Sequence, residues 1–190
     1  MRALTRRPVT DPVELAAVVA ECLADLEPGL APLGRTAGAG EIAVDIACVD
    51  ASRRLVLILC EIVAGPEAVL RAVEAGAWWG EHAALRARVF PGAAVDPGTP
   101  PRTLVVAGRF TDRALRLIRA LGPLAPTPVE CRVFGAAEDV VVGLERLDVP
   151  PPVAAPQPAA PPPPQREPGA ARAEVLIQQL ERLRFSEGFR

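Results

Sequence analysis

The chain has 190 residues, half of them hydrophobic, which is enough apolar surface for one well-buried core and little more. Its formal net charge of -2 and pI near 5.6 exclude a protein that binds nucleic acid through an overall basic surface. It contains no lysine, which excludes a P-loop lysine, a Schiff-base lysine and a lysine general base.

The ends and cysteines of the chain predict a cytoplasmic protein. Residues 1–11 include several arginines but no apolar run, so they do not resemble a signal peptide. The longest apolar stretch, residues 55–60, is far too short to span a bilayer. The cysteines are widely spaced and form no CxxC pair, a pattern typical of reduced, buried thiols; they are Cys22, Cys48, Cys60 and Cys131.

The first predicted element is a helix that begins at Pro12 and ends before Pro28. Asp11 is the expected N-cap, and Glu14 is expected to reach back to it as in a capping box. Apolar residues recur at helical spacing and predict one buried face; they are Leu15, Val18, Val19, Cys22, Leu23 and Leu26.

Two β-rich runs follow, 42–49 and 55–63, and the turn-like residues 50–53 between them predict an antiparallel hairpin. Pro66 opens a long predicted helix to about Val89, which a loop over residues 91–101 follows. The expected inner face of this helix consists of Val69, Leu70, Val73, Ala77, Ala84 and Leu85.

Residues 103–107 form a short predicted strand, and Thr111 is the expected N-cap of a helix through Leu121. Two more strands are predicted at 129–134 and 139–145, around a turn at Gly135. This order of elements predicts an α/β fold in which helices flank a mixed sheet. The expected buried stripe of the helix after Thr111 is Ala114, Leu115, Ile118 and Leu121.

The composition changes at Pro150, and nearly half of the 22 prolines lie between Pro150 and Pro168. We therefore predict a domain over 1–148, a proline-rich linker over 149–169 and a short amphipathic helix over 170–190. So short a helix is marginal alone, so its apolar side implies a partner protein or, alternatively, its own domain. The predicted anchors on that side are Leu176, Ile177, Leu180 and Leu183.

The hairpin carries the arrangement with a chemical meaning. Counting back from its turn places Asp45 opposite Ile58 or Leu59, and alternation along the second strand puts Leu59 and Glu61 on the same face as Asp45. An aspartate facing two polar residues at i and i+2 across a hairpin is one way in which Mg²⁺ nucleases build their site. Two acidic side chains then hold the metal, and a basic one orients the attacking water.

The chain from about residue 30 to 134 resembles the PD-(D/E)XK, or restriction-endonuclease-like, superfamily and is similar in layout to its RecB-like and NucS-like domains. The resemblance rests on residues 40–50 (GEIAVDIACVD), on 54–61 (RLVLILCE), on the helix containing 77–82 (AWWGEH) and on the strand 102–107 (RTLVVA). It implies a restriction-endonuclease-like mixed β-sheet flanked by helices and, in active members, Mg²⁺-dependent DNA cleavage.

The resemblance also implies that the site has degenerated. The family's second strand would end in Glu-x-Lys, and this chain has Leu59 and Glu61 there, so only Asp45 matches. RecB-like members would show Gln-x-x-x-Tyr in the long helix, where this chain has Arg71 and Ala75. A leucine among the ligands removes a charge and dehydrates a pocket meant for a strongly hydrated ion, so no catalytic residues, metal or cofactor are expected.

Alternatives remain for several residues. Glu14, Glu21 or Glu41 could supply a relocated carboxylate that binds metal with Asp45 and Glu61. The only histidine, His82, is expected to be an ordinary surface residue, and one of Trp78 and Trp79 to be core. The helix after Thr111 is locally basic and is either a solvated face or a nucleic-acid patch made of Arg109, Arg113, Arg116 and Arg119.

The sequence therefore predicts a pseudonuclease: a catalytically inactive nuclease-like domain that acts as a binding or adaptor module and recruits a partner protein through its C-terminal helix. The alternative functions are a metal-dependent DNA endonuclease with a relocated carboxylate set and a non-cutting nucleic-acid-binding module. No membrane association is expected.

Overall fold

The structure, a computed structural model, describes residues 5–37, 43–136 and 139–150. All of them belong to one compact unit bounded by Met1–Pro152. The predicted linker beyond Pro150 and the predicted C-terminal helix, with its anchors Leu176, Ile177, Leu180 and Leu183, lie outside the described residues. In the described part, no helix is long and apolar enough to span a membrane.

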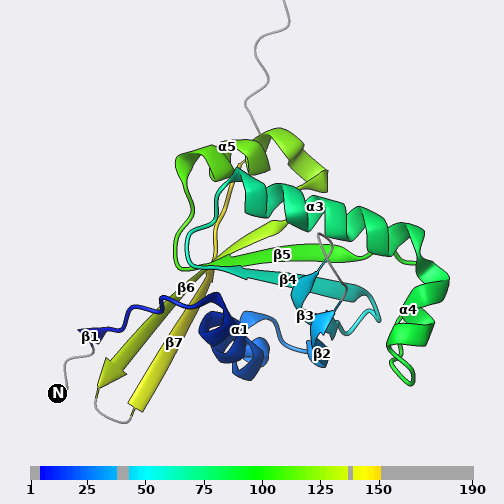
Figure 1. Cartoon of the computed structure of the whole chain (residues 1–190), viewed down its shortest axis with the longest axis horizontal. Helices are drawn as coiled ribbons and strands as arrows, with labels where there is room; N and C mark the ends of the chain where they lie inside the picture. Colours follow the sequence, from blue (N-terminus) through cyan, green and yellow to red (C-terminus); the bar gives the residue numbers. More distant parts are fainter. Residues whose placement is uncertain (1–4, 38–42, 137–138, 151–190) are drawn as a thin grey trace, which may run out of the picture. The chain divides into compact units, whose positions relative to one another are not determined.

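A mixed sheet flanked by helices forms the centre of the domain, as predicted (Figure 1). Its order is β1-β6-β5-β4-β3-β2, and β7 also pairs with β6. Strands β2, β3 and β4 are antiparallel neighbours, whereas β4, β5 and β6 run parallel. The strands are β1 (Thr5–Arg6), β2 (Ala31–Ala37), β3 (Val44–Val49), β4 (Leu55–Glu61), β5 (Arg102–Ala107), β6 (Thr127–Ala136) and β7 (Asp139–Arg146).

Helices cover both faces of the central strands. One face packs against α1 (Pro12–Glu21) and α2 (Leu23–Leu26), and the other packs against α3 (Pro66–Glu81), beside which α5 (Asp112–Leu121) lies. Two further short helices are α4 (Ala83–Val89) and η2 (Gly122–Leu124). Coverage on both faces explains why β4 is a nearly continuous apolar run rather than an alternating one.

The two helix N-caps predicted from the sequence are present. The side chain of Asp11 accepts a hydrogen bond from the backbone N–H of Val13, and that of Thr111 accepts one from Ala114, as expected for N-caps. Glu14 does not complete a capping box, because its carboxylate pairs with Arg7 at 2.9 Å.

Each of the two long predicted helices is divided in two. The first breaks at Cys22, between α1 and α2, and the second at His82, between α3 and α4. The predicted turn at Gly135 is also wrong, because β6 continues to Ala136. Strands β1 and β2 were not predicted; β2 contains Pro32 and Gly34, which are poor strand formers.

The inner face of α3 matches the predicted one only in part: Val69 is buried, as predicted, against Ala114 and Ile118 of α5. Ala68, Ala72, Ala75 and Trp79 pack on the sheet, whereas Leu70 is 47% exposed. Small residues let the helix approach closely: a Cβ added at Gly76 would lie 3.1 Å from the Thr103 methyl group. Close approach to the sheet therefore decides which face of α3 is buried.

A cluster of charged side chains joins segments that are distant in the sequence. At the start of β5, Nη2 of Arg102 lies 2.5 Å from Oε1 of Glu27, and its Nε lies 3.2 Å from Oδ2 of Asp50. Glu27 also pairs with Arg146 of β7. The hydrogen bond from Arg102 is the largest of the causes that lower the pKa of Glu27 from its ordinary value of 4.5. The cluster therefore stabilises the fold while Glu27 is ionised.

Replacing Glu27 by glutamine is expected to lower the free energy of unfolding at pH 7 by roughly 1 to 3 kcal/mol, since hydrogen bonds to charged groups lie in this range. Because folding lowers the pKa of Glu27, the contribution is complete above pH 4.5 and is lost as the pH falls through the folded-state pKa. Urea unfolding of both proteins between pH 7 and pH 3 measures this. Glu14→Gln, in a more exposed pair, should cost less than about 1 kcal/mol; equal losses in the two variants would contradict the prediction.

Candidate functional site

The register of the β3–β4 hairpin determines which residues can share a site. Ile46 pairs with Ile58 and Ala47 with Leu57, so the same count places Asp45 opposite Leu59. Leu57 and Leu59 lie in the core on the α3 side of the sheet, and Glu61 contacts α3 itself. The hairpin thus has the predicted register from Ile46 to Val49, and Leu59 and Glu61 share the α3 side of the sheet. Asp45 lies at the same end, one residue beyond the paired residues.

The cysteines support this register in part. Cys48 and Cys60 are buried, as predicted, and form no disulfide with another cysteine; both pack in the core on the α1 side, which is the face opposite Leu59. They are not near each other, however, because Cys48 pairs with Val56 and Cys60 lies four residues further along β4.

Asp45 is half-buried where the β3–β4 ladder ends. Its Oδ2 accepts a hydrogen bond of 2.8 Å from the backbone N–H of Cys60. The preceding residue, Val44, packs in the core on the α3 side, although Ile46 packs on the α1 side, so the alternation of β3 is interrupted at Asp45. One carboxylate oxygen is therefore committed to the backbone of β4.

Leu59 has no exposed surface and pairs with Val105 of β5. It belongs to the apolar cluster that includes Ala64 and Ala107. The position of Leu59 is thus packed with hydrocarbon, in which a strongly hydrated divalent cation would have to lose its water without gaining a ligand.

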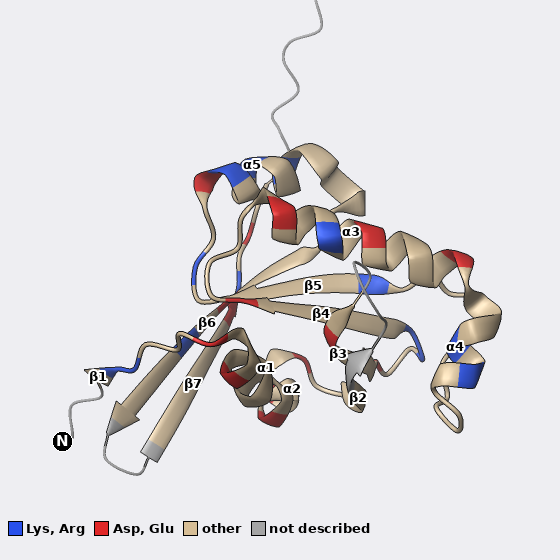
Figure 2. Ribbon diagram, viewed as in Figure 1, with Lys and Arg blue, Asp and Glu red and all other residues tan. Residues whose placement is uncertain are grey.

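Glu61 is paired with a cation from another element. Nη1 of Arg71, on α3, lies 2.8 Å from Oε1 of Glu61, and both side chains are partly exposed. Arg71 is the residue that stands where RecB-like domains would show glutamine. Figure 2 shows that α3 carries one basic band among acidic ones. The sequence contains this pair as a strand-end acid and a helix arginine, but their contact depends on how α3 packs.

The described residues do not form a metal site. In the part of the chain that the structure describes, no group of three or more His, Cys, Asp or Glu side chains could hold a metal ion. Glu14 and Glu21 lie on α1, which packs on the opposite face of the sheet from Leu59, so neither supplies the relocated carboxylate. Glu41, the third candidate, lies outside the described residues. The residues seen at Asp45 and Glu61 do not fit Mg²⁺.

The tryptophans and His82 have structural contacts. Trp79 is buried and packs against Phe90. Trp78 is half-buried and stacks on His82, which is exposed, with 4.1 Å between the centroids of the two rings. One of the two tryptophans is therefore core, as predicted. No described acidic or nucleophilic side chain accompanies His82 in a catalytic arrangement, since its ring nitrogen contacts the backbone oxygen of Trp78.

The predicted arginine patch divides into two parts. Arg109, Arg113 and Arg116 are exposed, and no carboxylate among the described residues forms an ion pair with them. Arg119 is half-buried, and its Nε donates a hydrogen bond to the backbone oxygen of Pro150. On α5, Arg113 and Arg116 are therefore the arginines that are exposed and form no ion pair with a described carboxylate.

Comparison with known proteins found a likeness to a solved structure. Neither a protein-family model nor a curated protein matches the chain. Among solved structures, the chain is similar to a protein in the EndoMS-dsDNA2 complex, with a TM-score of 0.38 and 24% sequence identity. The match covers 64% of this chain and 46% of that chain, so this chain spans about half the length of that protein.

Proposed function

We propose that this chain is a catalytically inactive nuclease-like domain that acts as a binding or adaptor module. One observation carries the proposal: Leu59, which stands where the resemblance to PD-(D/E)XK nucleases implies a metal ligand, is a fully buried alkyl side chain two residues before Glu61, which pairs with Arg71. This assignment of position 59 comes from the resemblance of residues 40–61 to PD-(D/E)XK nucleases, and the register of the hairpin supports it.

This arrangement does not provide the groups that metal-dependent hydrolysis of DNA requires. Mg²⁺ is bound in proteins through oxygen ligands, and Leu59 offers none. The carboxylate of Glu61 is neutralised by Arg71, and one oxygen of Asp45 accepts the Cys60 N–H. Without an oxygen ligand at Leu59, this arrangement lacks part of the ligand set that would hold a metal and lower the pKa of an attacking water molecule.

The endonuclease alternative needs a third carboxylate beside Asp45 and Glu61. Glu14 and Glu21 are on the wrong face of the sheet, which leaves Glu41 as the remaining candidate of the three. The adaptor proposal requires no such addition, so it is the function that the described residues favour.

We further propose that the C-terminal residues recruit a partner protein. The support comes from the sequence: a proline-rich stretch cannot bury a core, and the apolar residues beyond it have the spacing of helix-in-groove anchors. The charged residues that alternate with these anchors would keep the opposite side of such a helix in water.

Replacing two of the anchors, Leu176→Asp with Leu180→Asp in the full chain, is expected to abolish capture of the main binding partner and leave the melting temperature within about 2 °C, because surface substitutions usually change stability little. Affinity capture and thermal unfolding measure the two effects. The matched control is Gln178→Asp with Glu181→Gln, on the polar side, which should retain the partner. A large drop in melting temperature would instead show that these leucines belong to the core of the domain.

A second candidate is a nucleic-acid-binding module that does not cut. The exposed, unpaired guanidinium groups of Arg113 and Arg116 on α5 favour it, since arginine binds phosphate through paired hydrogen bonds. Mobility shifts of double-stranded and single-stranded DNA with and without Arg113→Ala and Arg116→Ala, at two salt concentrations, distinguish it from a protein adaptor.

A further inference from the structure

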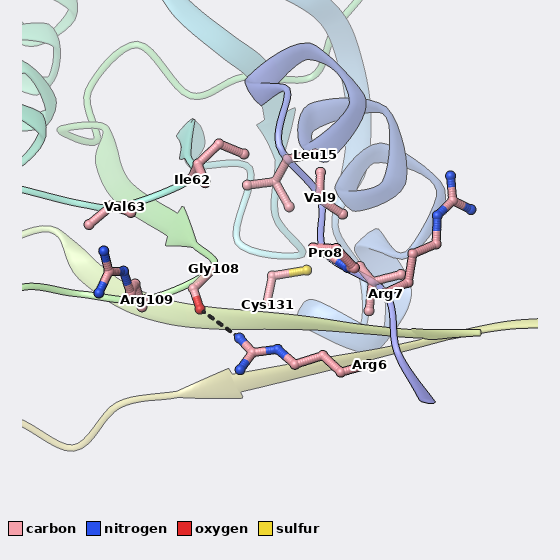
Figure 3. Close-up of a pocket in the computed structure, with 11 residues that line it drawn as sticks. Arg6, Arg7, Pro8, Val9, Leu15, Ile62, Val63, Gly108, Arg109 and Cys131 are labelled. Atoms are coloured by element: carbon pink, nitrogen blue, oxygen red, sulfur yellow. Dashed lines mark hydrogen bonds between the residues drawn. The ribbon is translucent and has the colours of Figure 1, made fainter. Parts of the chain in front are cut away.

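A cavity of about 370 Å³ lies on the α1 side of the sheet, at the carboxyl ends of β4 and β5 (Figure 3). The segments after these strands contribute Ile62 and Gly108, and the N-terminal segment contributes Arg6. Because Leu59 and Glu61 face α3 on the other side, the cavity is separate from the nuclease-like site. Its size is within the range of about 300 to 1,000 Å³ that small-molecule sites occupy.

The backbone around the cavity is well anchored. Arg6 pairs with Phe134 across the β1–β6 ladder, and the N–H of Arg7 donates a 2.8 Å hydrogen bond to the Val133 oxygen. Gly108 lies close to β4: an added Cβ there would meet the Ile62 carbonyl oxygen at 3.0 Å, so a larger residue would push the rim apart. The cavity is therefore built by the fold itself.

The floor of the cavity is apolar. Its side chains are aliphatic or a thiol, namely Val9, Leu15, Ile62, Cys131 and Val133. Burial raises the pKa of Cys131 to about 11, so the thiol is neutral and adds no negative charge. Among the described lining residues there is no aromatic ring on which a base could stack, and no side-chain amide or hydroxyl to read its edge.

The rim of the cavity is cationic. Arg6 and Arg109 both lie beside Gly108 in Figure 3, where Nη2 of Arg6 donates to the Gly108 oxygen at 3.4 Å. Neither forms an ion pair with a described carboxylate, whereas Arg7 is neutralised by Glu14. No acidic side chain lines the cavity in the described part of the chain. An incoming anion would thus meet uncompensated positive charge on either side of Gly108, from Arg6 and from Arg109, and no opposing carboxylate among the described lining residues.

We propose that this cavity binds a small amphipathic anion, a carboxylate or phosphate head on an aliphatic body, with the head at Arg6 and Arg109 and the body against Val9, Leu15 and Val133. The planar guanidinium matches both head groups with paired hydrogen bonds, and the aliphatic floor gains from covering an apolar chain. This binding role goes beyond the adaptor function and does not depend on it.

The test is calorimetric titration of the full chain with octanoate and with octyl phosphate. Saturable one-to-one binding is expected for at least one of them, and binding of the other shows which head group is preferred. Octanol and inorganic phosphate, which each lack one half of the ligand, should bind at least tenfold more weakly. Arg109→Ala should weaken binding at least tenfold, while Arg116→Ala, an exposed arginine outside the cavity, should leave it unchanged.

A second variant, Val9→Trp, fills the cavity without removing a charge and should abolish binding while circular dichroism shows a folded protein. Three results would overturn the proposal: no saturable binding of either octyl ligand up to millimolar concentration, equal binding by wild type and Arg109→Ala, or tighter binding of adenosine monophosphate than of both octyl ligands. The last result would show that the cavity prefers a nucleotide.

Discussion

Replacing Leu59 by glutamate is expected to lower the free energy of unfolding at pH 7 by at least about 3 kcal/mol, because it removes buried hydrocarbon and places an unpaired carboxylate in the core. Burial would raise the pKa of the new carboxyl group, so its cost relative to wild type should shrink as the pH falls towards 4.5. Urea unfolding at pH 7 and pH 4.5 measures the difference.

Leu59→Met is the matched control and should cost less than about 1.5 kcal/mol, since it nearly conserves volume and polarity. If the glutamate variant were as stable as wild type at pH 7, the site would already be open to water or a cation. That outcome would contradict the description of Leu59 as a packed core residue that closes the site.

Introducing the residues of the PD-(D/E)XK pattern is expected to create a metal site. A variant with Leu59→Glu and Glu61→Lys gains a second ligand and a basic group, and Arg71→Gln is added because Arg71, which now pairs with Glu61, would repel the new lysine. We expect this triple variant to bind Mn²⁺ at least tenfold more tightly than wild type, which corresponds to about 1.4 kcal/mol.

Calorimetry measures this affinity, and the rise in melting temperature on adding Mn²⁺ measures it independently, because a ligand that binds the native state stabilises it. Asp45→Ala in the triple background is the control and should remove the gain. If the triple variant folds, by circular dichroism, but gains no affinity, the assignment of Asp45, Leu59 and Glu61 to the family's motif is wrong.

Much of the fold follows from local sequence patterns. The hairpin could be placed because Asp50 makes a turn: its Oδ1 accepts hydrogen bonds from the N–H groups of Ser52 and Arg54, which fixes the count on both strands. The caps at Asp11 and Thr111 are likewise local, since each side chain bonds within its own first turn. Features that a side chain fixes by bonding to its own turn, as Asp50, Asp11 and Thr111 do, were therefore predictable.

Features decided by tertiary packing were not. The contact between Glu61 and Arg71 depends on which face α3 presents to the sheet, and a hydrophobicity pattern that favours Leu70 chose the wrong face. The cavity rim joins Arg6 to Arg109, more than a hundred positions apart, through the pairing of β1 with β6. Neither pair has a local pattern in the sequence that would reveal it.

The most direct test of the inactive site compares wild type with Asp45→Ala in a nicking assay on supercoiled and single-stranded DNA, with Mg²⁺ or Mn²⁺ present. Asp45 is the one residue that matches the nuclease motif, so any cleavage by this site must depend on it. We predict that the two proteins are equally inert with both metals. Nicking by wild type that disappears in Asp45→Ala would contradict the pseudonuclease proposal and establish the metal-dependent endonuclease in its place.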